Sequence, residues 1–141
     1  MNYRILMIIV LSLALLGCNK DEDDNSIDCK FTTLISSEAY QNAPSDLVAI
    51  NSLEINGDCL KINFSAGGCN GNSWEIILID SEDISESLPA QRNLRLSLKN
   101  EELCYAYITK ELTFDISNLK VSGNQVQLNI TNSFDTILYE Y

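Results

Sequence analysis

The chain has 141 residues, of which twenty are acidic and nine are basic, and its formal net charge at pH 7 is −11. This acidity argues against binding to nucleic acids or to anionic lipid headgroups, because both need a basic surface patch. The chain contains no histidine, which excludes histidine-based catalytic triads and the usual zinc ligand sets. We therefore predict a protein without a cofactor or metal that is not an enzyme.

The N-terminus combines a basic residue, Arg4, with an apolar run over residues 5–16. A helix needs about 20 apolar residues to cross a bilayer, so this shorter run predicts a cleaved signal helix. The run ends in the sequence LLGC, whose cysteine is Cys18. This ending resembles the lipobox of bacterial lipoprotein precursors. The resemblance implies that residues 1–17 are a signal peptide and that acylated Cys18 anchors the mature protein to the lipid bilayer, since two or three acyl chains hold a protein firmly.

An acidic segment, NKDEDDNS, follows the cysteine directly. It has no apolar side chain to bury and many like charges, so we predict a disordered tether over residues 18–30. A lysine followed by acidic residues at this place resembles the export signal of surface lipoproteins in Bacteroidota. That resemblance implies an outer-membrane location facing the cell exterior, with a periplasm-facing orientation as the alternative. A calcium loop starting at Asp21 is excluded, because its sixth position is Ser26 instead of glycine.

From residue 48 onward, apolar and polar residues alternate and turn residues interrupt them, which is typical of antiparallel strands. The expected strands span residues 48–55, 59–66, 74–79, 94–98, 126–130 and 136–141, while residues 103–116 form two strands or one bent strand. The segment 74–79 is apolar on both faces, which favours a central strand. We also expect a short helical turn near residues 36–43 that ends before Pro44.

These elements predict an all-β fold with a single domain over residues 31–141. Strands at this spacing favour an antiparallel β-sandwich of about seven or eight strands, and a barrel is the second choice.

Four cysteines remain besides Cys18, namely Cys29, Cys59, Cys69 and Cys104. An even number in an exported chain predicts two disulfides, for which three pairings exist. In a meander, the loops that hold Cys69 and Cys104 lie two strands apart and thus at the same end of the sheet, whereas Cys59 starts its strand at the opposite end. We therefore favour Cys69–Cys104, which leaves Cys29–Cys59 by elimination.

The densest group of carboxylates comprises Glu75, Asp80, Glu82, Asp83 and Glu86. The group runs from a predicted strand into a loop, where solvated charge explains it. A catalytic pair of carboxylates or a weak calcium site is the alternative interpretation.

Two tyrosines provide the candidate ligand-facing residues. Tyr105 and Tyr107 lie on the opposite face of their predicted strand from Ala106 and Ile108. An exposed aromatic pair can stack on sugar rings, although such pairs also pack against neighbouring strands.

Two longer segments, GDCLKINFSAGGCNGNSWEIILID and LRLSLKNEELCYAYITKELTFDISNL, resemble small β-sandwich lipoproteins of Bacteroidota over residues 45–141. The resemblance implies fold and location but no reaction. The relatives often carry histidine where this chain has Asn72, which argues against a metal or acid–base role for the loop. We predict a non-catalytic surface binding or accessory module. The alternatives are an inhibitor of a cationic secreted hydrolase, a carbohydrate-binding module or a histidine-free carboxylate enzyme, so the candidate partners are a cationic protein and a glycan.

Overall fold

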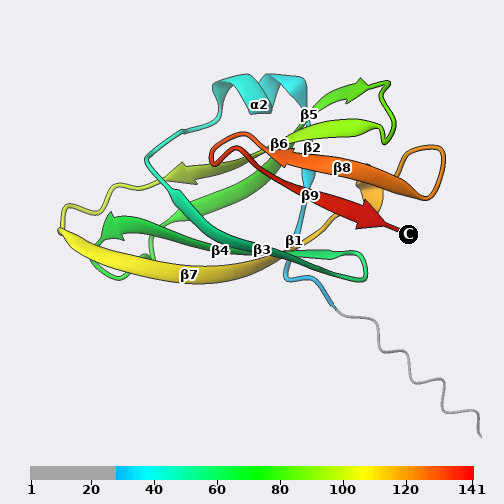
Figure 1. Cartoon of the computed structure of the whole chain (residues 1–141). Coiled ribbons are helices and arrows are strands. Elements are labelled where there is room, and N and C mark those ends of the chain that lie inside the picture. The colour runs from blue at the N-terminus through cyan, green and yellow to red at the C-terminus, as the bar shows by residue number, and fades with distance from the viewer. Residues whose placement is uncertain (1–27) are drawn as a thin grey trace, which may run out of the picture.

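The computed structural model describes residues 28–141 (Figure 1). The predictions of a signal peptide, of lipidation at Cys18 and of most of the tether lie outside these residues. Within the described part of the chain, no helix is both long and apolar enough to span a membrane.

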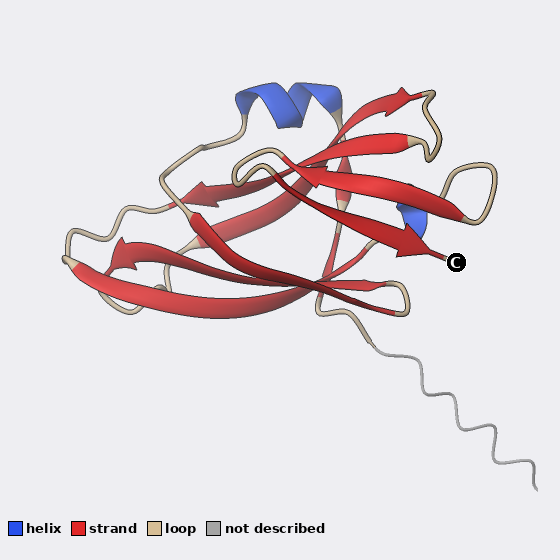
Figure 2. Cartoon of the chain, in the orientation of Figure 1, coloured by secondary structure: helices blue, strands red, loops and turns tan. Residues whose placement is uncertain are grey.

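Residues 28–141 form nine strands, one short α-helix and one 3-10 turn, with the strands arranged in two layers (Figure 2). In chain order they are β1 Phe31–Thr32, β2 Leu34–Ile35, α2 Ser37–Asn42, β3 Ala49–Asn56, β4 Cys59–Gly68, β5 Glu75–Ser85, β6 Gln91–Lys99, β7 Ala106–Asp115, η1 Ser117–Leu119, β8 Gln125–Ile130 and β9 Asp135–Glu140. The first sheet has the order β1-β7-β4-β3 and the second has the order β2-β5-β6-β8-β9. The prediction of a β-sandwich is therefore confirmed.

The alternation along each strand places one set of side chains between the sheets. On β4, the predicted inner face of Leu60, Ile62 and Phe64 is fully buried. Opposite it, β6 contributes Leu94 and β8 contributes Leu128, both also fully buried. Removing such side chains from water stabilises the fold by about 1.5–3 kcal/mol each.

The sheets are mixed and not purely antiparallel, which corrects one part of the prediction. β6 and β8 pair in parallel because the strand between them in sequence, β7, lies in the other sheet. β1 pairs in parallel with β7, and β2 in parallel with β5. These two short strands escaped prediction, since two residues cannot show an alternation. With Thr33 between them, they connect one sheet to the other at the start of the described chain.

Two further expectations change in detail. Residues 106–115 form one continuous strand, β7, and the residues from Leu103 to Tyr105 belong to the preceding loop. β5 is not central: only the two-residue β2 covers its outer side, and its Ile77 is exposed. The expected helical turn is present as α2, capped by the Ser36 hydroxyl, which accepts from the N–H of Ala39.

The acidic segment after residue 79 was wrongly predicted to be a loop. β5 continues through it to Ser85, with a bulge between Asp80 and Ile84. Asp80 is fully buried and pairs with Arg92, so this carboxylate is part of the interior and not of a solvated loop.

Candidate binding tip

The connections β4–β5 and β6–β7 both cross from one sheet to the other, and they do so at the same end of the sandwich. A disulfide between Cys69 and Cys104 joins them, with 4.7 Å between the Cα atoms. The second disulfide joins Cys29 to Cys59 at the opposite end of β4. These are the pairings favoured from the sequence, although the strands involved belong to two sheets instead of one meander. We call the end formed by residues 45–48, 69–74 and 100–107 the tip.

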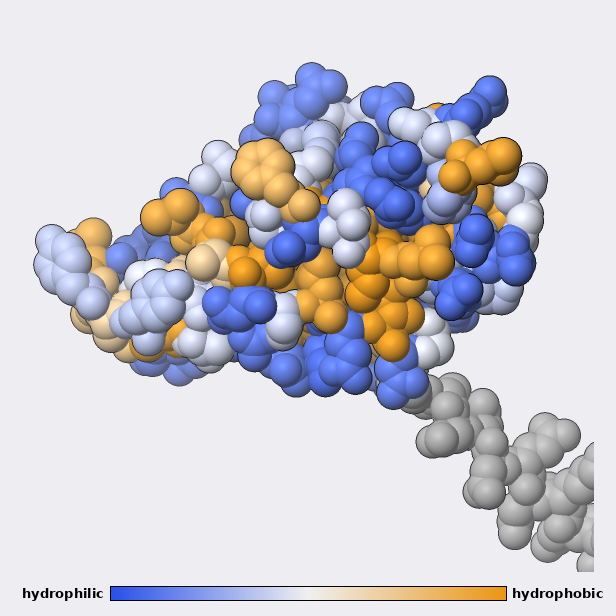
Figure 3. All heavy atoms as spheres, viewed as in Figure 1, coloured by the Kyte–Doolittle hydropathy of each residue, from blue (hydrophilic) through white to orange (hydrophobic). Residues whose placement is uncertain are grey.

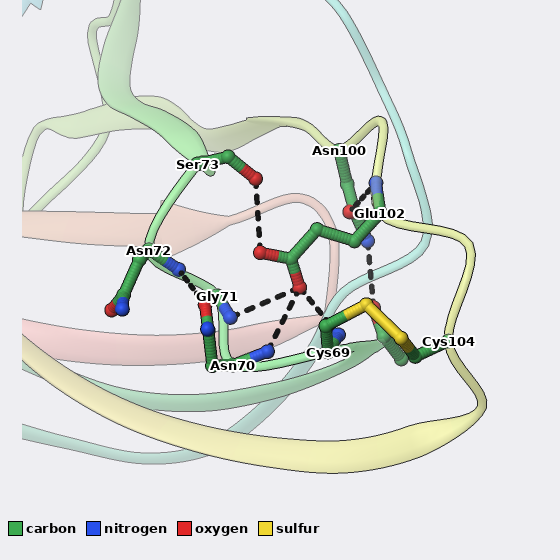
Figure 4. Close-up of a disulfide and its surroundings, with 9 residues drawn as sticks. Cys69, Asn70, Gly71, Asn72, Ser73, Asn100, Glu102 and Cys104 are labelled. Carbon is green, nitrogen blue, oxygen red and sulfur yellow. Dashed lines mark hydrogen bonds between the residues drawn. A yellow bond between two sulfur atoms is a disulfide. The ribbon is translucent and has the colours of Figure 1, made fainter.

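A carboxylate from one loop fills a ring of donors in the other loop (Figure 4). Glu102 Oε2 accepts hydrogen bonds from the backbone N–H groups of Cys69, Asn70 at 3.1 Å and Gly71 at 3.0 Å. Its Oε1 accepts from the Ser73 hydroxyl at 2.9 Å. Successive backbone N–H groups that converge in this way form a nest for an anion. The nest is thus occupied by the protein's own side chain.

The hydrogen bonds control the charge of Glu102. Partial burial of the carboxylate opposes its ionisation, but the backbone donors of Gly71, Cys69 and Asn70 and the hydroxyl of Ser73 outweigh that effect and lower the pKa of Glu102 to about 2. The side chain is therefore an anion at neutral pH, and it holds the two loops together by charge-assisted hydrogen bonds.

Two glycines make this arrangement sterically feasible. Gly71 has φ +69°, a conformation that L side chains rarely adopt. At Gly68, a Cβ atom would lie 2.5 Å from Glu102 Oε2 and 3.0 Å from the ring of Trp74. A larger residue at position 68 would therefore displace the carboxylate from the nest.

Asn100 attaches a third segment to the tip. Its backbone N–H donates to Asp46 Oδ2 at 2.7 Å, and its side-chain amide donates to the carbonyl of Gly67 at 2.7 Å. Its Oδ1 accepts from the backbone N–H of Glu102 at 3.0 Å. The segment before β3, the end of β4 and the β6–β7 loop are consequently fixed relative to one another.

Large apolar and aromatic side chains project from this fixed backbone, at the end of the molecule that lies at the left of Figure 3. The exposed fractions are 91% for Leu103, 102% for Tyr105, 70% for Tyr107 and 90% for Leu47. Tyr107 lies on the outer face of β7, opposite Gly67 of β4. Beside it is a groove of about 390 Å³ lined by Asp46, Leu47, Ala49, Ser65, Ala66, Gly67, Asn100 and Tyr107.

The structure brings together Tyr105 and Tyr107, the two tyrosines singled out from the sequence, with Leu47 and Leu103, which sequence reasoning missed. A leucine in a loop carries no periodic signal, so its exposure becomes visible only in the fold. Sequence reasoning also missed Glu102. The available signals were its position two residues before Cys104 and the glycine-rich loop around Cys69.

Three carboxylates of the acidic group singled out from the sequence have separate structural partners. Asp80 is buried with Arg92, and Glu75 pairs with Lys99 on β6. Glu82 Oε2 accepts the N–H of Ser37 at the start of α2. Nowhere in residues 28–141 do three or more histidine, cysteine, aspartate or glutamate side chains group so as to hold a metal ion.

No protein-family model matches the sequence, and no curated protein matches it at a significant level. The fold is similar to that of a NigD-like immunity protein from Bacteroides caccae, with a TM-score of 0.55, 12% identity and coverage of 78% of this chain and 59% of that one. It is also similar to a protein described as toxin-related from Parabacteroides distasonis, with a TM-score of 0.51, 17% identity and coverage of 79% and 60%.

The chain therefore spans about three fifths of the length of each of these solved structures. At these identities the likeness shows the fold alone. Both proteins come from Bacteroidota, the group to which the sequence resemblance pointed.

Proposed function

We propose that this chain is a lipid-anchored, non-catalytic binding protein of the bacterial cell envelope, and that its tip contacts a protein partner. The observation that carries the proposal is the exposure of Leu103, Tyr105 and Tyr107 on loops whose backbone is fixed by a disulfide and by the Glu102 nest.

The composition and rigidity of the tip support a protein–protein contact. Tyrosine is enriched at the centres of protein interfaces, where burial of a large side chain contributes most to affinity. A preformed loop also loses little conformational entropy on binding, so more of the contact energy appears as affinity. Asp46 and Glu101, which are exposed beside the apolar side chains, give the tip an acidic rim.

The position of the tip suits a tethered protein. The described chain begins at residue 28, near the end of β7, whereas the tip lies at the start of β7 (Figure 1). A strand of ten residues spans about 30 Å. If acylated Cys18 anchors the chain, the tip lies at the end of the domain away from the membrane attachment.

The charge of the chain favours a cationic partner. Three lysines of the sandwich are already paired with carboxylates, namely Lys61 with Glu54, Lys99 with Glu75 and Lys120 with Asp58, and acidic residues outnumber basic ones by twenty to nine, so carboxylates dominate the surface potential. Opposite charges accelerate encounter between proteins. The name of the NigD-like immunity protein supports the more specific proposal of an inhibitor or immunity protein that binds a cationic secreted protein at the outer face of the outer membrane, with a periplasmic partner as the alternative.

A glycan partner is the second candidate, and the groove beside Tyr107 favours it. Its walls combine the exposed aromatic ring with the polar side chains of Asp46 and Asn100. Stacking on an aromatic ring together with polar contacts is a common way to hold a sugar.

Site-specific photo-crosslinking on intact cells tests the proposal. A photoreactive phenylalanine analogue is introduced at Tyr105, at Tyr107 and, as a matched control, at Leu138, a partly exposed residue of β9. We expect one protein species to crosslink from Tyr105 and Tyr107 and not from Leu138, with a yield that falls as salt is raised. Equal crosslinking from all three positions would contradict the proposal, and transfer to polysaccharide with little salt dependence would favour the glycan.

A further inference from the structure

Two lysines of the described chain have no carboxylate partner within it, although the protein is strongly acidic. Most other basic side chains form ion pairs, namely Lys61 with Glu54, Arg92 with Asp80, Lys99 with Glu75 and Lys120 with Asp58. Arg95 instead donates to the backbone carbonyls of Ala39 and Ala43. Within residues 28–141, Lys30 and Lys110 form no ion pair.

These two lysines line the same cavity. It has a volume of about 220 Å³ and lies between β7 with β1 on one side and the start of β5 on the other. Its remaining lining residues are mainly apolar: Phe31, Gly71, Asn72, Trp74, Ile76 and Leu112. The lining of one cavity therefore combines two lysine side chains that have no carboxylate partner within residues 28–141 with mainly apolar groups.

Lys110 enters this cavity from the inner face of β7. Its Cα partner on β4 is Phe64, which is fully buried, and the residues with the same parity on β7 are Leu112 and Phe114. The ammonium donates to the carbonyl of Gly71 and lies 5.4 Å from the centre of the Trp74 ring. Because an ammonium has three N–H donors, two are left for a ligand.

Lys30 lines the cavity directly before β1. Its backbone N–H donates to Thr113 Oγ1 at 3.1 Å, which holds the residue beside β7. Its ammonium lies 5.5 Å from the centre of the Phe31 ring. The neighbouring disulfide of Cys29 with Cys59 fixes the chain at this point.

We infer that this cavity is a binding site for a small carboxylate that carries an apolar group. The two ammonium groups supply charge-assisted hydrogen bonds to the carboxylate, and the aromatic and aliphatic walls accommodate the apolar part. Nucleotides and other polyanions do not suit the site, because the net charge of −11 repels them and only two cations attract them. The carboxylate belongs either to a free organic acid or to the C-terminus of a peptide.

Fluorescence provides a direct readout, because Trp74 lines the cavity and the chain has one tryptophan. The full chain in a zwitterionic detergent is titrated with hexanoate, with the peptide acetyl-Gly-Gly-Leu, and with their uncharged counterparts hexanol and the peptide amide. We expect saturable changes with hexanoate or the free peptide and none with the uncharged compounds. The stronger of the two charged probes identifies the source of the carboxylate. Absence of binding by both, or equal binding of the uncharged compounds, would overturn the inference.

Variants then test whether each of the two lysines contributes to binding. Lys110→Met and Lys30→Met keep much of the apolar stem and remove the charge, so each should weaken binding about tenfold or more. The matched control is Lys61→Met, because Lys61 lies on the outer face of the same sheet and pairs with Glu54; its affinity should equal that of the unaltered chain.

Thermal unfolding checks that each variant is folded. Lys30 is exposed, so Lys30→Met should fold. Its affinity therefore tests the inference even if Lys110→Met does not fold. If Lys30→Met binds the carboxylate probe as tightly as the unaltered chain does, the inferred site is wrong. Tyr105→Ala should leave this binding intact, because Tyr105 does not line the cavity; the result is therefore independent of the partner contact proposed for Tyr105 and Tyr107.

Discussion

Arg92 donates two hydrogen bonds to the carboxylate of Asp80, from Nε to Oδ2 at 3.0 Å and from Nη2 to Oδ1 at 2.8 Å. The side chains are 6% and 0% exposed. The pair lies between β5 and β6 at the bulge where their register shifts, and Asp80 Oδ1 also accepts the N–H of Glu82. Glu82 has φ 73°, so the buried ion pair stabilises an unusual backbone conformation at this bulge.

Arg92→Met should destabilise the protein strongly. The substitution removes the cation but leaves the Asp80 carboxylate buried, and breaking a buried pair in this way costs about 3–5 kcal/mol. Urea unfolding at pH 7 measures the change in the free energy of unfolding. The free energy of unfolding of the double variant Asp80→Leu with Arg92→Met should be closer to that of the unaltered protein, because no buried charge remains unpaired.

Lys61→Met supplies the comparison for this experiment. It breaks the exposed pair with Glu54, and exposed pairs contribute about 0–1 kcal/mol. If Arg92→Met and Lys61→Met lower the free energy of unfolding by the same amount, the description of the Asp80–Arg92 pair as buried is incorrect.

The alternation of residues in β4, β6 and β8 was sufficient to predict the sandwich from the sequence, because each strand shows one buried and one polar face over several residues. Asp80 shows what such patterns cannot reveal. It follows an apolar run and precedes further acidic residues, so local composition indicates a solvated loop. Its burial depends on Arg92, which reaches it across neighbouring strands, and no pattern within either segment indicates that contact.

Part of the tip could also be predicted from the order of the strands. The end of the sheet at which Cys69 and Cys104 lie follows from counting strands, and so does the neighbourhood of Tyr105. The nest around Glu102 requires the actual course of the loop after Gly68, which depends on a positive φ at Gly71 and on space that only the folded chain defines.

The pKa of Glu102 gives the protein a testable dependence on acid. The folded-state pKa of about 2 lies below the ordinary value of 4.5, so the contribution of this group to stability is complete above pH 4.5 and is lost as the pH falls toward 2. Glu102→Gln removes that titration. We therefore expect the free energy of unfolding to fall less steeply between pH 5 and pH 2 in Glu102→Gln than in the unaltered protein. The control is Glu111→Gln on the outer face of β7, whose free energy of unfolding should fall with pH as steeply as that of the unaltered protein. If Glu102→Gln also shows this steep fall, the hydrogen bonds from the nest do not lower the pKa of Glu102.

The two disulfides should have similar effects on stability and different effects on binding. They close loops with sequence separations of 35 and 30 residues, for which the chain-entropy model gives about 3–4 kcal/mol each. Replacing Cys69 and Cys104 by serine, or Cys29 and Cys59 by serine, should lower the unfolding free energy in guanidinium by comparable amounts. Only the first pair of substitutions should reduce crosslinking from Tyr105, because only that disulfide joins the loops of the tip. Equal loss of crosslinking in both double variants would show that the tip does not depend on its own disulfide.

Lipidation at Cys18 is the prediction on which the proposed location depends. Intact mass of protein purified from membranes should equal residues 18–141 plus acyl chains, less four hydrogens for the two disulfides. Cys18→Ala should abolish acylation, so the intact mass of this variant should lack the acyl chains and the chain should lose its lipid anchor. Treatment of whole cells with a protease then distinguishes the two orientations: loss of the protein indicates surface display, and protection indicates the periplasmic face. An unlipidated mass for the unaltered chain would refute the anchor and, with it, the proposed location.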